Sequence, residues 1–299
     1  MHASRLRLAK REFNNEPFYE KSDMDNREKV LVTGAAGKIA GQVLPYLRDR
    51  YDVVLLDLRN IDRDGNELAD VQVADLLSPD RDSYRQHFHG ADAVVHFGYV
   101  QGRGDFESEL SNVQMAFNIY EIACEENVRR VVVAGSNHAA DFYTPLILNH
   151  QMNFVDPDER ALSDNYYGWA KEAYEHLGFV FACGKMANRP LENVHIRIGG
   201  PRETDVANCL KGDLRSVRRA LGAYISERDM AQLFVRSIET EDIRDSNGVP
   251  FQIFYGVSGN SHNFWSIANA RKIIGYEPQD NSEIRFKELI AKHIAAAES

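Results

Sequence analysis

The sequence predicts an α/β fold, a doubly wound parallel sheet with a small C-terminal substrate lobe. Short apolar runs rich in β-branched residues alternate with segments long enough to form helices. Uninterrupted apolar strands of this kind are typical of a parallel sheet that is covered on both faces. A glycine-rich turn follows the first run, and an acidic residue ends the second. Together these features predict a fold of the Rossmann type.

The expected elements follow one another in a regular order. The runs KVLVT, YDVVLLDL, AVVHF, RVVVA and VHIRI have the composition of buried strands, and segments with apolar residues at helical spacing separate them. Strands are expected at 29–33, 51–58, 71–74, 93–97, 130–134, 194–198 and 250–257. Helices are expected at 39–48, 110–126, 167–181, from 227 onward and near the C-terminus.

Composition and charge narrow the possible partners. The chain of 299 residues carries a formal net charge of −10 at pH 7. That charge argues against a nucleic acid or an anionic membrane surface, because both need a dominant basic surface. The cysteines Cys124, Cys183 and Cys209 lack the short spacings of a zinc site or a disulfide framework, so we expect no metal.

Two features of the chain bear on its location in the cell. No apolar run approaches the roughly 20 residues of a membrane span, and the N-terminus lacks the apolar core of a secretory signal. Residues 1–28 read as a flexible arm or an interface strap. An organelle transit peptide is the alternative, but Glu12, Glu16 and Glu20 follow the basic stretch at once, and such peptides avoid acidic residues. We therefore expect a cytoplasmic protein.

The turn after the first strand has the pattern of a dinucleotide site. Glycines let the backbone approach a diphosphate, whose charge the first amides of the following helix can meet. The residues expected there are Gly34, Ala36, Gly37, Lys38 and Ile39. Asp57 falls about 20 residues further on, where a carboxylate binds both ribose hydroxyls and repels a 2′-phosphate, which favours NAD over NADP. The alternative is a plain tight turn with Asp57 capping a loop.

Two further groups of polar residues follow later strands. Asp75 and Leu76 are expected to contact adenine, although helix capping explains Asp75 nearly as well. Ser136, Asn137 and His138 come after the run RVVVA, so we expect them at the carboxyl edge of the sheet, where open α/β sheets bind ligands. Asn137 and His138 have a simpler interpretation as a turn and a surface imidazole.

Tyr167 and Lys171 stand four residues apart, which places both on one face of a helix. A nearby ammonium lowers the pKa of a phenol and lets it act as a base. The alternative is a packed tyrosine beside a lysine whose charged end reaches solvent.

Several stretches together resemble an extended short-chain dehydrogenase/reductase of the NAD-dependent epimerase/dehydratase family. They are TGAAGKIA, the acid at Asp57, HFGYV at 96–100, GSNH at 135–138, YGWAK and VHIRIGG. Within that superfamily the sequence is most similar to uronate dehydrogenases and to archaeal-type NAD-dependent glucose-6-phosphate dehydrogenases. The resemblance covers roughly residues 29 to 285.

The resemblance implies a role for each matching position. The catalytic residues would be Ser136, Tyr167, Lys171 and Asn112, the last as part of a proton relay. Further contacts with the cofactor would come from Phe97, Gly98, Tyr99, Asn112 and Ile198, together with Tyr167 and Lys171. The sugar would be held by Gln101, Ser136, Asn137, His138, Tyr167, Gly200 and Arg219. Arg219 would bind the substrate's acidic group, and a guanidinium suits a carboxylate or a phosphate equally.

The sequence departs from the family pattern at several points. Ala40, with Gly41 beside it, replaces the final glycine of the turn, and Gln101 and Gly200 stand where serines are usual. The segments 139–165 and 203–221 are longer than the usual connections and would border the sugar pocket.

The resulting hypothesis is an NAD-dependent oxidation of an acidic aldose at its anomeric carbon. The alternatives are a nucleotide-sugar epimerase or dehydratase that keeps its NAD bound, and a non-catalytic protein that senses NAD. Residues 29–199 would form the NAD-binding domain, and 200–299 mainly a substrate lobe with elements that return to the core. The resemblance also implies a homo-oligomer, a dimer or larger, paired through the helices at 110–126 and 167–181.

Overall fold

A computed structural model describes residues 27–102, 104–186 and 189–298. The arm predicted over 1–28 lies outside this part of the chain except for its last two residues. Within the described residues, no helix combines the length and the apolar character that crossing a membrane requires.

A seven-stranded sheet forms the centre of the protein, with the strand order β3-β2-β1-β4-β5-β6-β7. All neighbouring strands run parallel. The strands are β1 (Lys29–Thr33), β2 (Asp52–Asp57), β3 (Val71–Val73), β4 (Ala93–His96), β5 (Arg130–Ser136), β6 (Glu192–Ile198) and β7 (Phe251–Gly256). The predicted doubly wound α/β fold is confirmed.

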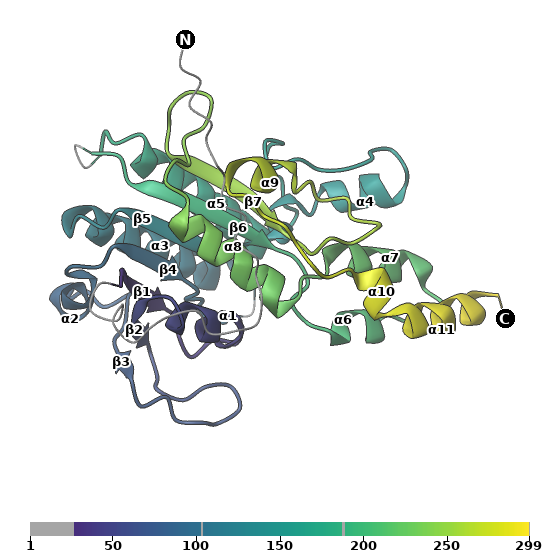
Figure 1. The fold of residues 1–299 in the computed structure, drawn as a ribbon, viewed down its shortest axis with the longest axis horizontal. Coiled ribbons are helices and arrows are strands. Elements are labelled where there is room, and N and C mark those ends of the chain that lie inside the picture. Colours follow the sequence, from purple (N-terminus) through teal and green to yellow (C-terminus); the bar gives the residue numbers. More distant parts are fainter. Residues whose placement is uncertain (1–26, 103, 187–188, 299) are drawn as a thin grey trace, which may run out of the picture.

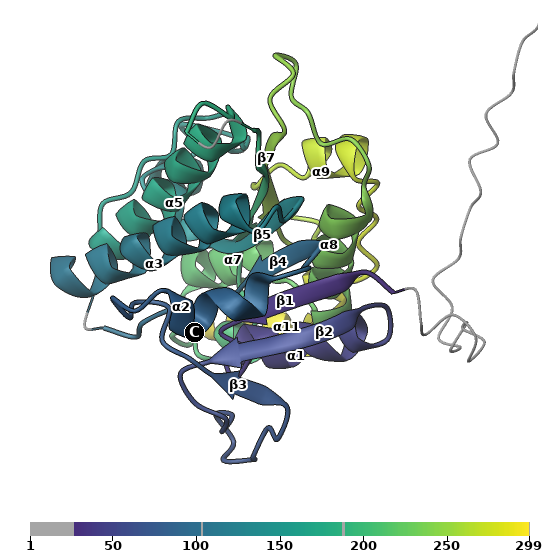
Figure 2. The same ribbon diagram turned by 90° about the vertical axis from the view of Figure 1, so that its left-hand side faces the viewer.

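Helices cover both faces of the sheet, as the apolar strands require. One face packs against α2 (Asp82–Arg85), η2 (Gln86–Phe88), α3 (Phe106–Glu125) and α5 (Tyr166–Ala182). The other packs against α1 (Lys38–Arg48), α8 (Glu227–Glu239) and α9 (Ala268–Ile273). Figure 2 shows α3 and α5 on one side of the strands and α1 and α8 on the other.

The remaining helices gather beyond one end of the sheet. They are η3 (Asn137–Ala140), α4 (Tyr143–Leu148), α6 (Thr204–Ala207), α7 (Leu214–Ala223), α10 (Ser282–Arg285) and α11 (Lys287–Ala297). Figure 1 places α6, α7, α10 and α11 together, away from the helices that cover the sheet. Val206, Val217 and Leu221 form a small core of their own with Phe286 and Leu289.

The structure extends several predicted elements. The fifth strand continues to Ser136, which pairs with Ile198 of β6, so this serine is held in the sheet instead of following it. Helix α3 begins at Phe106, earlier than the predicted Leu110, because Asp105 caps it by accepting a hydrogen bond from the Ser108 amide. The two long insertions contain α4 in one case and α6 and most of α7 in the other.

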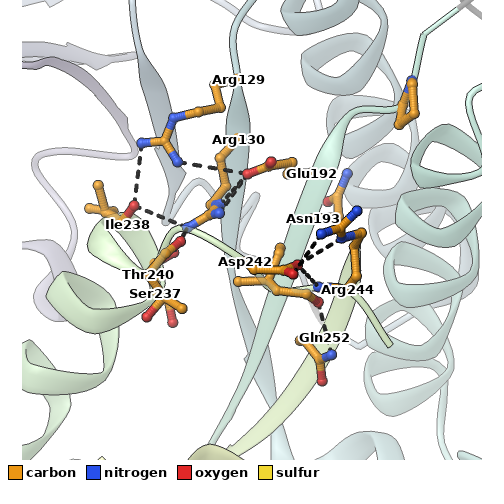
Figure 3. Close-up of polar contacts among 12 residues, drawn as sticks. Arg129, Arg130, Glu192, Asn193, Ser237, Ile238, Thr240, Asp242, Arg244 and Gln252 are labelled. Atoms are coloured by element: carbon orange, nitrogen blue, oxygen red, sulfur yellow. Dashed lines mark hydrogen bonds and ion pairs between the residues drawn. The ribbon is translucent and has the colours of Figure 1, made fainter. Parts of the chain in front are cut away.

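An arginine network holds α8 at the end of the sheet opposite to the carboxyl edge. Arg130, which is fully buried at the start of β5, donates hydrogen bonds to the carbonyls of Ser237, Ile238 and Thr240 at the C-terminal end of α8 (Figure 3). Its guanidinium also pairs with Glu192 at 2.6 Å. These contacts satisfy helix carbonyls that have no partner within the helix.

A buried ion pair attaches α5 to the sheet. Arg197 of β6 and Glu175 of α5 are 1% and 2% exposed, and their two hydrogen bonds are both 2.8 Å long. Tyr255 of β7 accepts a third bond from Arg197, at 2.9 Å. Glu175 lies one helical turn after Lys171, so the pair fixes the part of α5 that carries the Tyr–Lys motif.

We predict that Arg197→Leu lowers the free energy of unfolding by about 3–5 kcal/mol, because the substitution leaves the Glu175 carboxylate buried without its partner. Arg244→Ala is the matched control, since Arg244 pairs with Asp242 at the surface, where both side chains are more than half exposed, and such pairs contribute about 0–1 kcal/mol. Urea denaturation followed by circular dichroism measures both. Equal effects of the two substitutions would contradict the conclusion that burial makes the Arg197–Glu175 pair important for stability.

Candidate active site

The carboxyl ends of β1 and β4 meet at the point where the strand order reverses, which is where open α/β sheets bind nucleotides. The turn after β1 and the turn after β4 touch there. Gly34 has φ +72°, and a Cβ built on it would stand 2.4 Å from the Gly98 amide nitrogen. Only glycine fits at position 34, because both the backbone conformation and the neighbouring turn exclude a side chain.

The start of α1 offers unpaired amides to an anion. Gly37 is the N-cap; within the described residues no side chain caps this helix, and its first turn holds no acidic residue. Such a terminus favours a phosphate. Ala40 is fully buried, whereas a Cβ on Gly41 would meet open space. Ala40 therefore occupies the position of the motif that packs against the sheet, as the resemblance to the family implies.

Asp57 ends β2 beside this turn. Its carboxylate accepts hydrogen bonds from the Ala36 amide at 3.0 Å and from the Arg59 amide at 3.3 Å. The side chain thus faces the glycine turn, where a ribose hydroxyl would reach it. Asp75 accepts from the Leu77 amide at 2.9 Å within a local turn. The next helix begins only at Asp82, so the alternative of helix capping is wrong, and Leu76 is buried.

Tyr167 and Ser136 come together at the carboxyl edge, one from the start of α5 and the other from the end of β5. Burial raises the pKa of Tyr167, while a hydrogen bond with Ser136 and the charge of Arg202 act in the opposite direction. The net direction is opposite to the one predicted from the Tyr–Lys spacing, because in the free protein desolvation outweighs the groups that favour the phenolate.

Lys171 lies beneath Tyr167 and is 5% exposed. Its ammonium stands 5.5 Å from the ring centre of Tyr167, 5.1 Å from that of Tyr99 and 4.7 Å from that of Tyr174. Burial lowers the pKa of Lys171 to about 8, and the charge of Glu109 opposes that shift. The alternative of a lysine with its charged end in solvent is therefore wrong.

Asn112 is fully buried on α3 and holds the turn after β4. Its side-chain oxygen accepts from the Val100 amide at 2.7 Å, and its nitrogen donates to the Val100 carbonyl at 3.1 Å. This contact fixes the segment that carries Phe97, Gly98 and Tyr99. A part for Asn112 in a proton relay stays a prediction.

A cavity of about 600 Å³ opens beside the predicted catalytic residues. It unites four of the predicted substrate residues from three parts of the chain: Asn137, His138, Gly200 and Arg219. The His138 ring packs edge-on against Tyr167, with ring centres 5.6 Å apart, so the cavity adjoins the phenol. Gln101 is exposed and does not belong to the residues that line this cavity, so its contact with a sugar stays a prediction.

Sequence reasoning missed three charged residues, two at this cavity and a third that hydrogen-bonds to Tyr99. Arg202 lines it and pairs with Asp205 at 2.8 Å. Asp141 accepts hydrogen bonds from His138 and, at 3.4 Å, from Arg219, and so joins two predicted sugar ligands. Its spacing of three residues from His138 was the available signal. Glu109, the third, precedes the helix start that the sequence predicted, although it lies on the face of Asn112.

The fold and the site define a dinucleotide-binding α/β protein with a Ser–Tyr–Lys cluster at the carboxyl edge of its sheet. A model described as the NAD dependent epimerase/dehydratase family matches residues 30–179, and the chain belongs to that family.

Individual relatives agree with this assignment. A uronate dehydrogenase of Pseudomonas syringae is 30% identical over 260 residues, which cover 86% of this chain and 83% of the relative. An NAD-dependent glucose-6-phosphate dehydrogenase of Haloferax volcanii is 29% identical over 267 residues, covering 85% of this chain and 94% of the relative. A solved structure described as a mutated uronate dehydrogenase is 26% identical and superposes with a TM-score of 0.70, covering 89% of this chain and 86% of that one.

We predict opposite effects of alanine at two glycines of the glycine-rich motif. Gly34→Ala weakens NAD binding and destabilises the fold, because its Cβ would collide with Gly98 at a positive φ. Gly41→Ala, in the same motif, raises the free energy of unfolding by about 0.5–1 kcal/mol, because Gly41 lies inside α1 with open space at its Cβ. NAD titration by calorimetry and urea denaturation measure the two effects. A Gly34→Ala protein that binds NAD normally would refute the proposal that the turn after β1 holds the cofactor.

Proposed function

We propose that this chain is an NAD-dependent sugar dehydrogenase that oxidises the anomeric carbon of an acidic aldose, a uronate or a sugar phosphate, to a lactone. The observation that carries the proposal is the position of the Tyr167 ring. It lies between the buried ammonium of Lys171 and the ring of His138, which lines the cavity that also contains Arg219. Relatives described as dehydrogenases of uronate and of glucose-6-phosphate support the same chemistry.

The residues present fit NAD, because the start of α1 has no side-chain cap, Gly34 leaves no room for a side chain beside Gly98, and the Asp57 carboxylate contacts the same turn. When bound, NAD accepts the hydride that leaves the anomeric carbon. Gly34, Ala36, Gly37, Lys38 and Ile39 would hold its diphosphate and Asp57 its ribose. The remaining predicted contacts are Asp75 and Leu76 near the adenine. Toward the opposite end of the cofactor they are Phe97, Gly98, Tyr99, Asn112, Tyr167, Lys171 and Ile198.

The protein's own groups account for the proton and for the orientation of the sugar. Tyr167 takes the proton of the anomeric hydroxyl, and the positive charge of Lys171 stabilises the phenolate that does so. Ser136 donates a hydrogen bond to the reacting oxygen, and Asn137 and His138 bind other hydroxyls. Arg219 binds the carboxylate or phosphate of the substrate, which exchanges places with Asp141 as its anionic partner.

The two alternative functions make different demands on the same site. An epimerase or dehydratase would keep NAD bound through purification and form no net NADH. A sensor would bind NAD without oxidising any sugar. Ser136, Tyr167 and Lys171 are all present, and the last is buried at an energetic cost that a sensor does not require. This observation favours catalysis.

Homo-oligomerisation through α3 and α5 is part of the proposal. The two helices pack side by side and leave large apolar side chains exposed: Phe106, Leu110, Tyr166, Phe179 and Val180. Apolar strips of this kind often mark an interface. A cytoplasmic location and the absence of a nucleic-acid partner remain expectations on the sequence grounds given above.

We predict that Tyr167→Phe lowers kcat by about 10²–10⁴-fold, the usual contribution of a general base, while NAD binding persists. The assay follows NADH formation by absorbance across uronates, sugar phosphates and neutral aldoses. If none of these sugars is oxidised and the substitution changes nothing, the proposed mechanism is wrong.

A second prediction concerns the acidic group of the substrate. Arg219→Gln raises KM for the acidic sugar by about 10–100-fold, because a hydrogen bond to a charged group contributes about 1.5–3 kcal/mol, and it leaves a neutral aldose nearly unaffected. Arg215→Gln, an exposed change of equal charge on the same helix outside the cavity lining, is the control. Equal losses for acidic and neutral sugars would exclude Arg219 as the anion ligand.

A further inference from the structure

A carboxylate with no part in the proposed reaction is buried beside the catalytic lysine. Glu109, in the first turn of α3, has no exposed surface. One of its oxygens accepts a hydrogen bond from the Tyr99 hydroxyl at 2.6 Å, and the other accepts one from the Asn112 amide at 3.4 Å. Burying a carboxylate is costly unless it is hydrogen-bonded and has a charge partner.

The ammonium of Lys171 is the matching cation. Apart from its contacts with three tyrosine rings, it donates a long hydrogen bond of 3.4 Å to the Ala134 carbonyl. The charge of Glu109 raises the pKa of Lys171, and it raises the pKa of Tyr167 as well. Both groups of the Tyr–Lys pair therefore respond to this one carboxylate.

Glu175, one helical turn after Lys171, already has its partner in Arg197. The remaining titratable groups around Lys171 are uncharged near neutral pH. His96 of β4 and His195 of β6 are buried, and desolvation lowers the pKa of each to about 3. Burial raises the pKa of Tyr99, after β4, and of Tyr174, on α5. Among the described residues around Lys171, Glu109 of α3 is thus the anion that balances it.

Tyr99 links the carboxylate to the catalytic pair mechanically. Its hydroxyl is fixed by Glu109, while its ring stands 5.1 Å from the Lys171 ammonium and meets the Tyr167 ring edge-on at 5.6 Å. A tyrosine ring attracts a cation over its face and prefers edge-on contacts with another ring. Fixing the hydroxyl of Tyr99 therefore holds the ring against both catalytic side chains.

We propose that Glu109, together with the Tyr99 hydroxyl, is a positioning residue that supplies the buried counter-charge of Lys171 and so sets the pH range in which the Tyr–Lys pair works. The inference rests on the proposed dehydrogenase function for its kinetic consequence. Its electrostatic part, the charge balance between Glu109 and Lys171, holds for the free protein regardless of the substrate.

The kinetic test compares the pH profile of kcat for Glu109→Gln with that of the parent. Removing the negative charge lowers the pKa of Tyr167 and of Lys171 together, so the optimum and both limbs of the profile shift to lower pH. Glu107→Gln removes the same charge from an exposed position in the same turn of α3 and leaves the profile in place. A loss of activity in Glu109→Gln without any shift along the pH axis would mean a merely structural role and would overturn the proposal.

A second measurement needs no turnover. In protein labelled with ¹³C at the lysine ε-carbons, the Lys171 resonance, assigned by its loss in Lys171→Met, titrates with a midpoint near pH 8 in the parent. The midpoint is lower in Glu109→Gln and is restored in part by Glu109→Asp. An unchanged midpoint refutes the counter-charge even if the enzyme is active, and a lowered midpoint supports it even if no sugar is ever oxidised.

Tyr99→Phe keeps the test open if Glu109→Gln does not fold. The variant retains the ring and the carboxylate but removes the hydrogen bond between them, and Tyr99 is 37% exposed. The Tyr99 ring is then no longer fixed against the Lys171 ammonium, so the cation loses part of its stabilisation and the Lys171 midpoint falls, by less than in Glu109→Gln. A midpoint equal to that of the parent would show that the Tyr99 hydroxyl has no part in the arrangement.

Discussion

The bidentate ion pair between Arg197 and Glu175 is the constraint on which the geometry of the site depends. It joins the centre of α5 to β6 inside the protein, where neither group reaches water. An uncompensated charge at either end would cost several kcal/mol, so the two elements have one strongly preferred register. Tyr167 and Lys171 lie on the turns of α5 that precede Glu175, and the approach of Tyr167 to Ser136 follows from that register.

The site itself arises because the carboxyl ends of parallel strands share one edge. Segments that are distant in sequence, after β1, β2, β4 and β5, converge there without any special arrangement. The C-terminal lobe then closes one side, since α7 brings Arg219 to the loop that begins at Ser136. The small core formed by Val206, Val217 and Leu221 packs α7 against its neighbouring helices.

Electrostatics in this site are governed by burial more than by net charge. The chain is acidic overall, yet the proposed catalytic centre contains a buried cation, and Arg219 and Arg202 at the cavity are each paired with an aspartate. An aspartate beside each guanidinium stabilises its positive charge when no substrate is bound. An anionic group on the substrate would then compete with Asp141, so selectivity for acidic sugars would depend on the strength of that internal contact.

The sequence by itself determined the fold class, the glycine turn with Asp57, and the Tyr–Lys and Ser–Asn–His groups, because these depend on local spacing and on the rule that parallel strands end at one edge. Only the tertiary structure decided which charges face one another. Glu109 meets the Tyr99 hydroxyl between α3 and the turn after β4, Arg197 meets Glu175 between a strand and a helix, and Asp141 meets Arg219 over a separation of 78 residues. Pairs of this kind arise from packing in three dimensions, and no local pattern in the chain records them.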